Sequence, residues 1–192
     1  MSKETIIESI KNSVQTKELL LSDSATIELI QDMALACISC IESGGKIIFC
    51  GNGGSFGDSQ HLSAEFTGKY AKDREPMASV ALGTNSSSMS AIGNDYGYEY
   101  VFSRELEAIG KKEDILICIT TSGNSKNILE VLKSAKEMNI KYFILTGNSG
   151  GALKDEASCI KVPSDITGRI QESHIMIGQI VCQIVEESIF PN

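Results

Sequence analysis

The chain has 192 residues, a net charge of −8 and only three prolines, with no low-complexity run and no block of like charge. This length suits a single domain over residues 1–192. The acidic balance argues against nucleic acid as the main partner, because proteins that bind its backbone usually carry a basic face. The polar, amphipathic start and the lack of an apolar run of membrane-spanning length predict no signal peptide, no membrane partner and a cytoplasmic location.

Two helices are expected at the start of the chain. Apolar residues recur at helical spacing over residues 3–21, and a second helix is expected from an N-cap at Ser24 to about Ser43. Cys37 and Cys40 form a CxxC spacing inside this second pattern, without a second such pair. Reduced core cysteines explain this spacing better than redox chemistry or a metal site does. Because both helices are extra to a simple doubly wound sheet, residues 1–43 are predicted to cover a neighbour in an oligomer.

The rest of the chain alternates between strands and helices. The expected strands are residues 47–50, 78–82, 114–119, 141–145 and 158–162. The segment 93–95 is expected to break the short helix that follows the second strand, and a last long helix is expected from a cap at Asp165 or Thr167 to Phe190. This alternation predicts an α/β fold with a five-stranded parallel sheet covered by helices on both faces.

Three loops that follow predicted strands are rich in glycine and hydroxyl groups. They are Gly51–Ser55 (GNGGS), Thr120–Ser125 (TTSGNS) and Thr146–Gly151 (TGNSGG). In open α/β sheets ligands bind beyond the carboxyl ends of the strands, and glycine loops before helices bind anions. The first loop lacks both a Walker motif and a full dinucleotide fingerprint, so a plain βα turn is its alternative interpretation. Together the loops predict a phosphosugar site.

His61 and Glu65 stand four residues apart, on one face of the helix that follows the first loop. Such a pair can move protons or bind a metal ion, and an incidental pair on a polar helix face is the alternative. In the apolar last helix, Gln171, His174 and Gln179 need polar partners or a cavity. Gln171 and Gln179 are about 80° apart and share a face. Satisfied core amides are the alternative interpretation of these glutamines.

Several segments taken together resemble the sugar isomerase (SIS) domain family, and within it the bacterial phosphoheptose isomerases. These segments are CGNGGS, QHLSAEFTGKY, AIGNDYGYEYVFSR, TTSGNSKN, LTGNSGG and RIQESH. The resemblance covers nearly the whole chain and implies a flavodoxin-like, doubly wound fold. It also implies the isomerisation of D-sedoheptulose 7-phosphate to D-glycero-D-manno-heptose 7-phosphate through an enediolate, for lipopolysaccharide or capsule biosynthesis. The implied partners are this phosphorylated seven-carbon sugar and three further copies, in a homotetramer with sites between subunits.

The resemblance also implies roles for individual residues. The implied substrate-binding residues are Asn52, Gly53, Gly54, Ser55, Glu65, Asn94, Asp95, Thr120, Thr121, Ser122, Ser125 and Gln171. Glu65 matches the catalytic carboxylate. His61, Glu65 and Gln171 match three ligands of a Zn²⁺ ion, and the remaining ligand and second acid/base falls at Gln179.

Position 179 is where the chain departs from the family, which has a histidine there. An amide oxygen can ligate a metal, but an amide cannot exchange protons near neutral pH. His174 is not a simple substitute, because it lies about 300° from Gln171 around the helix. In relatives this histidine would move protons between the substrate oxygens. Here water, a metal-bound hydroxyl or Asp95 would have to do so. The alternative function is a non-catalytic or weakly active SIS-fold binding protein, of the replication-initiator-associating or sugar-phosphate-sensing type. An engineered substitution that traps substrate is a third possibility.

Overall fold

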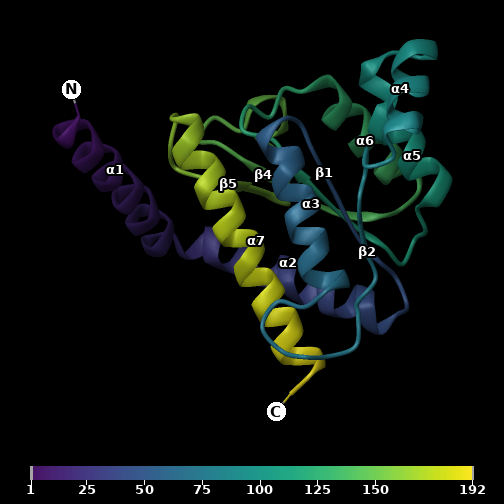
Figure 1. Cartoon of the computed structure of the whole chain (residues 1–192), viewed down its shortest axis with the longest axis horizontal. Helices are drawn as coiled ribbons and strands as arrows, with labels where there is room; N and C mark the ends of the chain where they lie inside the picture. The colour runs from purple at the N-terminus through teal and green to yellow at the C-terminus, as the bar shows by residue number, and fades with distance from the viewer. Residues whose placement is uncertain (1, 192) are drawn as a thin grey trace.

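The protein, seen in a computed structural model that describes residues 2–191, is built on one five-stranded parallel sheet. The strands are β1 (Ile47–Gly51), β2 (Ser79–Ala81), β3 (Ile115–Ile119), β4 (Lys141–Thr146) and β5 (Cys159–Lys161). Their order is β2-β1-β3-β4-β5, and every neighbouring pair is parallel (Figure 1). This is the flavodoxin-like, doubly wound order, so the predicted fold class is confirmed.

Helices cover both faces of the sheet. They are α1 (Lys3–Ser22), α2 (Ser24–Glu42), α3 (Gly54–Thr67), α4 (Ser86–Asp95), α5 (Val101–Ile109), α6 (Lys126–Glu137) and α7 (Thr167–Ile189). Alternate strand residues point to opposite faces. Ile47 and Phe49 of β1 pack in one core with α2, α3 and α7, whereas Ile48 and Cys50 pack in a second core with α5 and α6.

Three predicted helix boundaries are wrong. Asp23, not Ser24, caps α2, because its Oδ1 accepts hydrogen bonds from the amides of Ala25 (3.2 Å) and Thr26 (3.3 Å). The segment 93–95 does not break α4, which continues to Asp95 and is closed by Gly97 at φ +107°. Gly93 does not end the helix, because a glycine is tolerated inside a helix. The helix ends near Gly97 because the positive φ there favours glycine. Within the described residues, α7 begins after Ile166 without a side-chain cap from Asp165 or Thr167.

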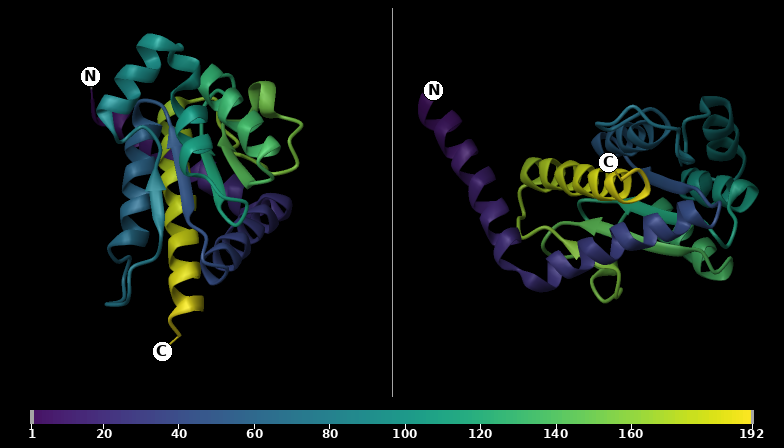
Figure 2. Two further views of the ribbon diagram at one scale, coloured as in Figure 1. Left: turned by 90° about the vertical axis from the view of Figure 1, so that its right-hand side faces the viewer. Right: turned by 90° about the horizontal axis from the view of Figure 1, so that it is seen from below.

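The two leading helices differ in how they meet the rest of the chain. Helix α1 extends away from it (Figures 1 and 2) and leaves Ile6, Ile10 and Val14 60%, 59% and 49% exposed. Helix α2 is long and apolar enough to cross a membrane, which corrects the expectation that no segment has that length. In the structure Met33 and Cys37 of α2 are buried in the core. Core helices of soluble proteins also meet the length criterion, so one such helix is weak evidence for a membrane span.

The six cysteines are all buried and free, as the prediction of reduced core cysteines requires. Cys50 and Cys118 are register partners on β1 and β3, with their sulfur atoms 3.4 Å apart. Burial and the neighbouring Cys50 raise the pKa of the Cys118 thiol well above its ordinary value. The Cys118 thiol is therefore kept neutral beneath the loop that leaves β3.

Candidate functional site

The hydroxyl-rich loops after β3 and β4 pack against each other at the carboxyl edge of the sheet. Gly123 has φ +65°, and a Cβ atom there would stand 2.1 Å from the carbonyl oxygen of Gly150. The Thr121 carbonyl accepts a hydrogen bond from the Gly147 amide at 3.1 Å. The two loops thus hold each other in place, and only glycine fits at their point of contact.

The loop that follows β3 has the features of an anion site. Thr120 is buried, and its Oγ1 accepts a hydrogen bond from the Gly123 amide at 3.3 Å, which closes the turn. The Ser122 hydroxyl accepts a hydrogen bond from the Asn124 amide at 3.2 Å. Ser125 is the N-cap residue of α6, yet among the described residues its side chain makes no capping bond. Its hydroxyl and the free amides at the start of α6 are therefore available to an anion.

Asn52 of the first loop is held by a residue that the sequence analysis did not single out. The side-chain amides of Asn52 and Asn127 form two reciprocal hydrogen bonds of 2.8 Å, and the Tyr98 hydroxyl donates to Asn52 Oδ1 at 3.2 Å. Asn127 is buried in the first turn of α6. Asn52 and Ser125 line one surface hollow, so the structure brings two of the predicted substrate-binding residues together. The sequence did offer one signal for Asn127, because it places a polar amide at a core-facing position of an amphipathic helix.

The predicted pair on α3 is formed. His61 Nε2 lies 2.9 Å from Glu65 Oε1, and the two side chains are 52% and 21% exposed. Both groups therefore reach solvent from one face of the helix that starts at the first loop. A carboxylate beside an imidazole is an arrangement that can accept and return a proton.

Helices α3 and α7 run side by side in the same direction, in close contact at two glycines. A Cβ atom at Gly54 would lie 2.6 Å from Gln171 Nε2, and a Cβ atom at Gly178 would lie 2.4 Å from a methyl carbon of Leu62. Gln171 therefore lies against the first turn of α3, and Gln179 directly follows the second contact.

Further along α7, Cys182 is buried in the core that α3 and α7 share. Burial raises the pKa of the Cys182 thiol to about 12, and the negative charge of Glu65 contributes to the rise. The helix with Gln171 and Gln179 is packed beside the helix with His61 and Glu65.

His174 lies away from this pair. It is fully buried, and its Nε2 donates a hydrogen bond to the Thr146 carbonyl at 3.1 Å, at the end of β4. Its Nδ1 is buried without a partner among the described residues. Burial lowers the pKa of His174 to about 4, so the ring is neutral near pH 7. As expected from the helix geometry, His174 does not stand in for a histidine at position 179.

Asn94 and Asp95 are placed apart from the other predicted residues. They lie in the last turn of α4, exposed, with Asn94 Nδ2 donating to Asp95 Oδ1 at 2.8 Å. With Ser86 and Ser90 they line a separate surface hollow. Within residues 2–191, no hydrogen bond connects them to the first loop, to the loop after β3 or to the pair on α3.

The possible metal ligands on this face are few. Among the described residues, no three side chains of His, Cys, Asp and Glu converge on one point. His61 and Glu65 supply one imidazole and one carboxylate, both of which zinc prefers. Any further protein ligand from α7 would be an amide oxygen of Gln171 or Gln179.

Comparison with known proteins shows which family the chain belongs to. The SIS domain profile matches residues 14–147. The chain is 48% identical over 184 residues to the phosphoheptose isomerase of Aneurinibacillus thermoaerophilus, covering 95% of this chain and 93% of the relative. It is 49% identical to phosphoheptose isomerase 1 of Campylobacter jejuni, covering 91% of each chain. This chain belongs to the phosphoheptose isomerases of the SIS domain family.

Solved structures of phosphoheptose isomerases share the same fold with this SIS domain. The structure of the Francisella tularensis protein matches with a TM-score of 0.91 and 34% identity, over 97% of this chain and all of that one. The structure of the Neisseria gonorrhoeae protein matches with a TM-score of 0.88 and 37% identity, over 96% and 98% of the two chains. These matches extend beyond the SIS profile, which ends before α7.

Proposed function

We propose that this SIS domain is a phosphoheptose isomerase that converts D-sedoheptulose 7-phosphate to D-glycero-D-manno-heptose 7-phosphate. The observation that carries the proposal is the Glu65 carboxylate, paired with His61 at 2.9 Å on the helix that starts at the GNGGS loop. The relatives that match most of the chain are named phosphoheptose isomerases, which supports the same reaction.

In the proposed reaction Glu65 is the base that moves the carbon-bound proton. It takes a proton from C1 of the ketose, the C–H electron pair forms a C1–C2 double bond, and the C2 carbonyl oxygen becomes an oxyanion. The C1 hydroxyl proton passes to O2, and Glu65 returns its proton to C2 as the C1 carbonyl forms. Atoms and charge balance without a redox partner, as an enediolate isomerisation requires.

The substrate phosphate is proposed to bind at the loop after β3. Thr120, Thr121, Ser122 and Ser125 offer hydroxyl groups there, and the start of α6 offers free amides with the positive end of a helix dipole. This site needs no cluster of basic side chains, which agrees with a chain of net charge −8. Asn52 to Ser55 are proposed to contact the sugar hydroxyls. Asn94 and Asp95, which lie in a separate hollow of this chain, are proposed to contact the sugar only in the oligomer.

A Zn²⁺ ion is proposed as the cofactor, with His61, Glu65, Gln171 and Gln179 as its ligands. The fit rests on the 2.9 Å pair of His61 and Glu65 and on the packing of α7, which carries both glutamines, beside α3. When bound, the ion would polarise the substrate oxygens at C1 and C2. Two of the four ligands are neutral amides, so we expect weaker binding than at sites built from three His, Cys or Glu ligands.

Gln179 is proposed to slow the reaction without abolishing it. An amide cannot carry the proton between O1 and O2, but the 52% exposed His61 shows that solvent reaches this face of α3. We propose that water performs this transfer. Asp95 is a less suitable carrier within one chain, because it lies on α4 in a separate hollow.

The assembly and the cellular role are also proposals. The exposed apolar side chains of α1 suit a contact with further copies of this chain, which supports a homotetramer in which residues 1–43 form an interface. We also propose a cytoplasmic location and use of the heptose for lipopolysaccharide or capsule; both rest on the family resemblance and not on the fold.

The test is proton NMR of the protein with Zn²⁺ and sedoheptulose 7-phosphate in heavy water. We expect the aldose to appear with deuterium at C2, and we expect Glu65→Gln to remove turnover while circular dichroism stays unchanged. Turnover by Glu65→Gln would show that Glu65 is not the base. A Gln179→His variant should be faster than the unaltered chain. If neither the unaltered chain nor Gln179→His turned over, the binding-protein function would be favoured.

A further inference from the structure

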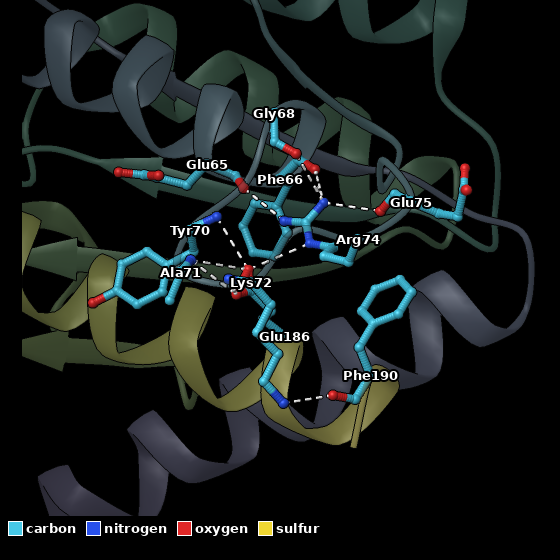
Figure 3. A network of polar contacts seen from close by, with 10 residues as sticks. All are labelled: Glu65, Phe66, Gly68, Tyr70, Ala71, Lys72, Arg74, Glu75, Glu186 and Phe190. Atoms are coloured by element: carbon cyan, nitrogen blue, oxygen red, sulfur yellow. Dashed lines mark hydrogen bonds and ion pairs between the residues drawn. The ribbon is translucent and has the colours of Figure 1, made fainter. Parts of the chain in front are cut away.

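A buried ion pair lies just beyond the C-terminal end of α3. Arg74 Nε donates to Glu186 Oε2 at 3.3 Å, and both side chains are 2% exposed (Figure 3). Arg74 belongs to the loop that follows α3, and Glu186 belongs to α7, 112 residues later in the chain. The pair therefore connects the end of one helix to its neighbour.

The Glu186 carboxylate is held by the loop after α3. It accepts hydrogen bonds from the backbone amides of Tyr70 (3.0 Å), Ala71 (2.9 Å) and Lys72 (2.6 Å). Burial raises the pKa of Glu186, but these three amides and the Arg74 charge lower it by more, so the group is a carboxylate at neutral pH. Glu186 thus fixes the course of the loop on the side of α7.

The Arg74 guanidinium is held by the last turn of α3. One of its terminal nitrogens donates to the Glu65 carbonyl at 2.8 Å, and the other donates to the carbonyls of Phe66 (2.8 Å) and Gly68 (3.1 Å). The last carbonyls of a helix have no partner inside the helix, and a cation there is favoured by the helix dipole. Arg74 therefore caps α3 at the residue that carries the proposed base.

We propose that Arg74 and Glu186 are a positioning pair for catalysis. The pair connects α3 to α7 at a third place along the two helices. The other two are the contacts of Gly54 with Gln171 and of Gly178 with Leu62. It fixes the last turn of α3, and with it Glu65, relative to the helix that bears Gln171 and Gln179. The inference depends on the proposed function, because it assigns the pair to the placement of that reaction's base.

Replacement of a buried ion pair by apolar residues is often neutral for stability, so such a pair is weak evidence of a stabilising role. A shift of about 1 Å in a catalytic group can cost about a hundredfold in rate. Loss of the cap would let the last turn of α3 fray and would move the Glu65 carboxylate away from its place beside His61.

The experiment compares Glu186→Gln and Arg74→Lys with a matched control at a second buried carboxylate. Asp114 is 3% exposed, accepts hydrogen bonds from the amides of Lys46 (2.9 Å) and Lys111 (2.8 Å), and pairs with the Lys46 ammonium group. It lies just before β3, between β3 and β1 rather than between α3 and α7. Asp114→Asn therefore removes a similar buried charge whose hydrogen-bond partners lie outside α3, α7 and the loop after α3.

We expect all three variants to melt at a lower temperature than the unaltered chain. At a temperature where each is folded, Glu186→Gln and Arg74→Lys should lower kcat by about 10- to 100-fold with KM nearly unchanged. Asp114→Asn should keep its kcat. Hydrogen exchange should become faster over residues 64–72 in the first two variants and not in the third.

Two outcomes would overturn the positioning role. One is a full kcat in both Glu186→Gln and Arg74→Lys, and the other is an equal loss of kcat in Asp114→Asn. A loss of kcat confined to Glu186→Gln and Arg74→Lys would support the positioning role. If one of these two variants does not fold, the kcat of the other tests the role. An inactive unaltered chain would overturn the proposed function instead, and hydrogen exchange would then show whether the pair orders the end of α3.

Discussion

The contact between Gly178 and Leu62 gives a sharp prediction about how closely α3 and α7 are packed. A Cβ atom at position 178 would lie 2.4, 2.6 and 3.1 Å from the two methyl carbons and the Cγ of Leu62. Leu62 is fully buried, so its side chain cannot move aside freely. Overpacking of this kind costs about 1–3 kcal/mol, and replacing a helical glycine by alanine gains about 1 kcal/mol. Gly178→Ala should therefore destabilise the chain by about 1 kcal/mol.

Gly178→Ala should stabilise the chain, rather than destabilise it, when Leu62 is replaced by alanine. In Leu62→Ala the atoms that block a Cβ at position 178 are gone, so only the gain in helix propensity remains, about 1 kcal/mol. Urea unfolding of the unaltered chain, the two single variants and the double variant measures this coupling, which we expect to be about 2 kcal/mol. If Gly178→Ala stabilised both backgrounds, the two helices would not be held together as tightly as the structure indicates.

Two further predictions concern His174 and Gly123. Burial lowers the pKa of His174 from 6.5 to about 4, so as the pH falls the imidazole is protonated in the unfolded state before it is protonated in the folded state. The free energy of unfolding should therefore drop by about 2 kcal/mol between pH 7.5 and 5. Urea unfolding of His174→Asn should show a smaller drop, and an equal drop would contradict the assignment. Gly123→Ala should separate the loops after β3 and β4 and raise KM about tenfold, equivalent to about 1.4 kcal/mol of binding. Gly168→Ala, which meets no atom of the described residues within 4 Å, is the matched control, and an equal KM in the two variants would refute the prediction.

The order of elements was predictable because its signals are local. Apolar runs followed by glycine loops mark the strands and their carboxyl ends, and the i, i+4 spacing placed His61 and Glu65 side by side. The helix boundaries were less predictable. Ser24 and Asp23 are both good N-cap residues, and only the extended backbone of Asp23, at φ −94° and ψ 93°, decides between them.

The contacts that hold the candidate site together were not predictable from the sequence. Arg74 and Glu186 are separated by 112 residues, and most of their partners are backbone groups, which carry no residue signature. The reciprocal bonds of Asn52 and Asn127 join residues 75 positions apart. Asn94 and Asp95 were grouped with the other substrate residues by resemblance, and the fold of one chain leaves them on α4 in a hollow of their own.

The six buried thiols have a consequence for handling the protein. In the folded chain they are shielded from solvent and, for Cys37, Cys118 and Cys182, burial keeps the thiol protonated. Unfolding removes this shield from all six at once and returns each thiol to an ordinary, more reactive state. Oxidation of the denatured chain would then trap non-native disulfides and make thermal unfolding irreversible. Reductant must therefore be present in every unfolding measurement if its midpoint is to report an equilibrium.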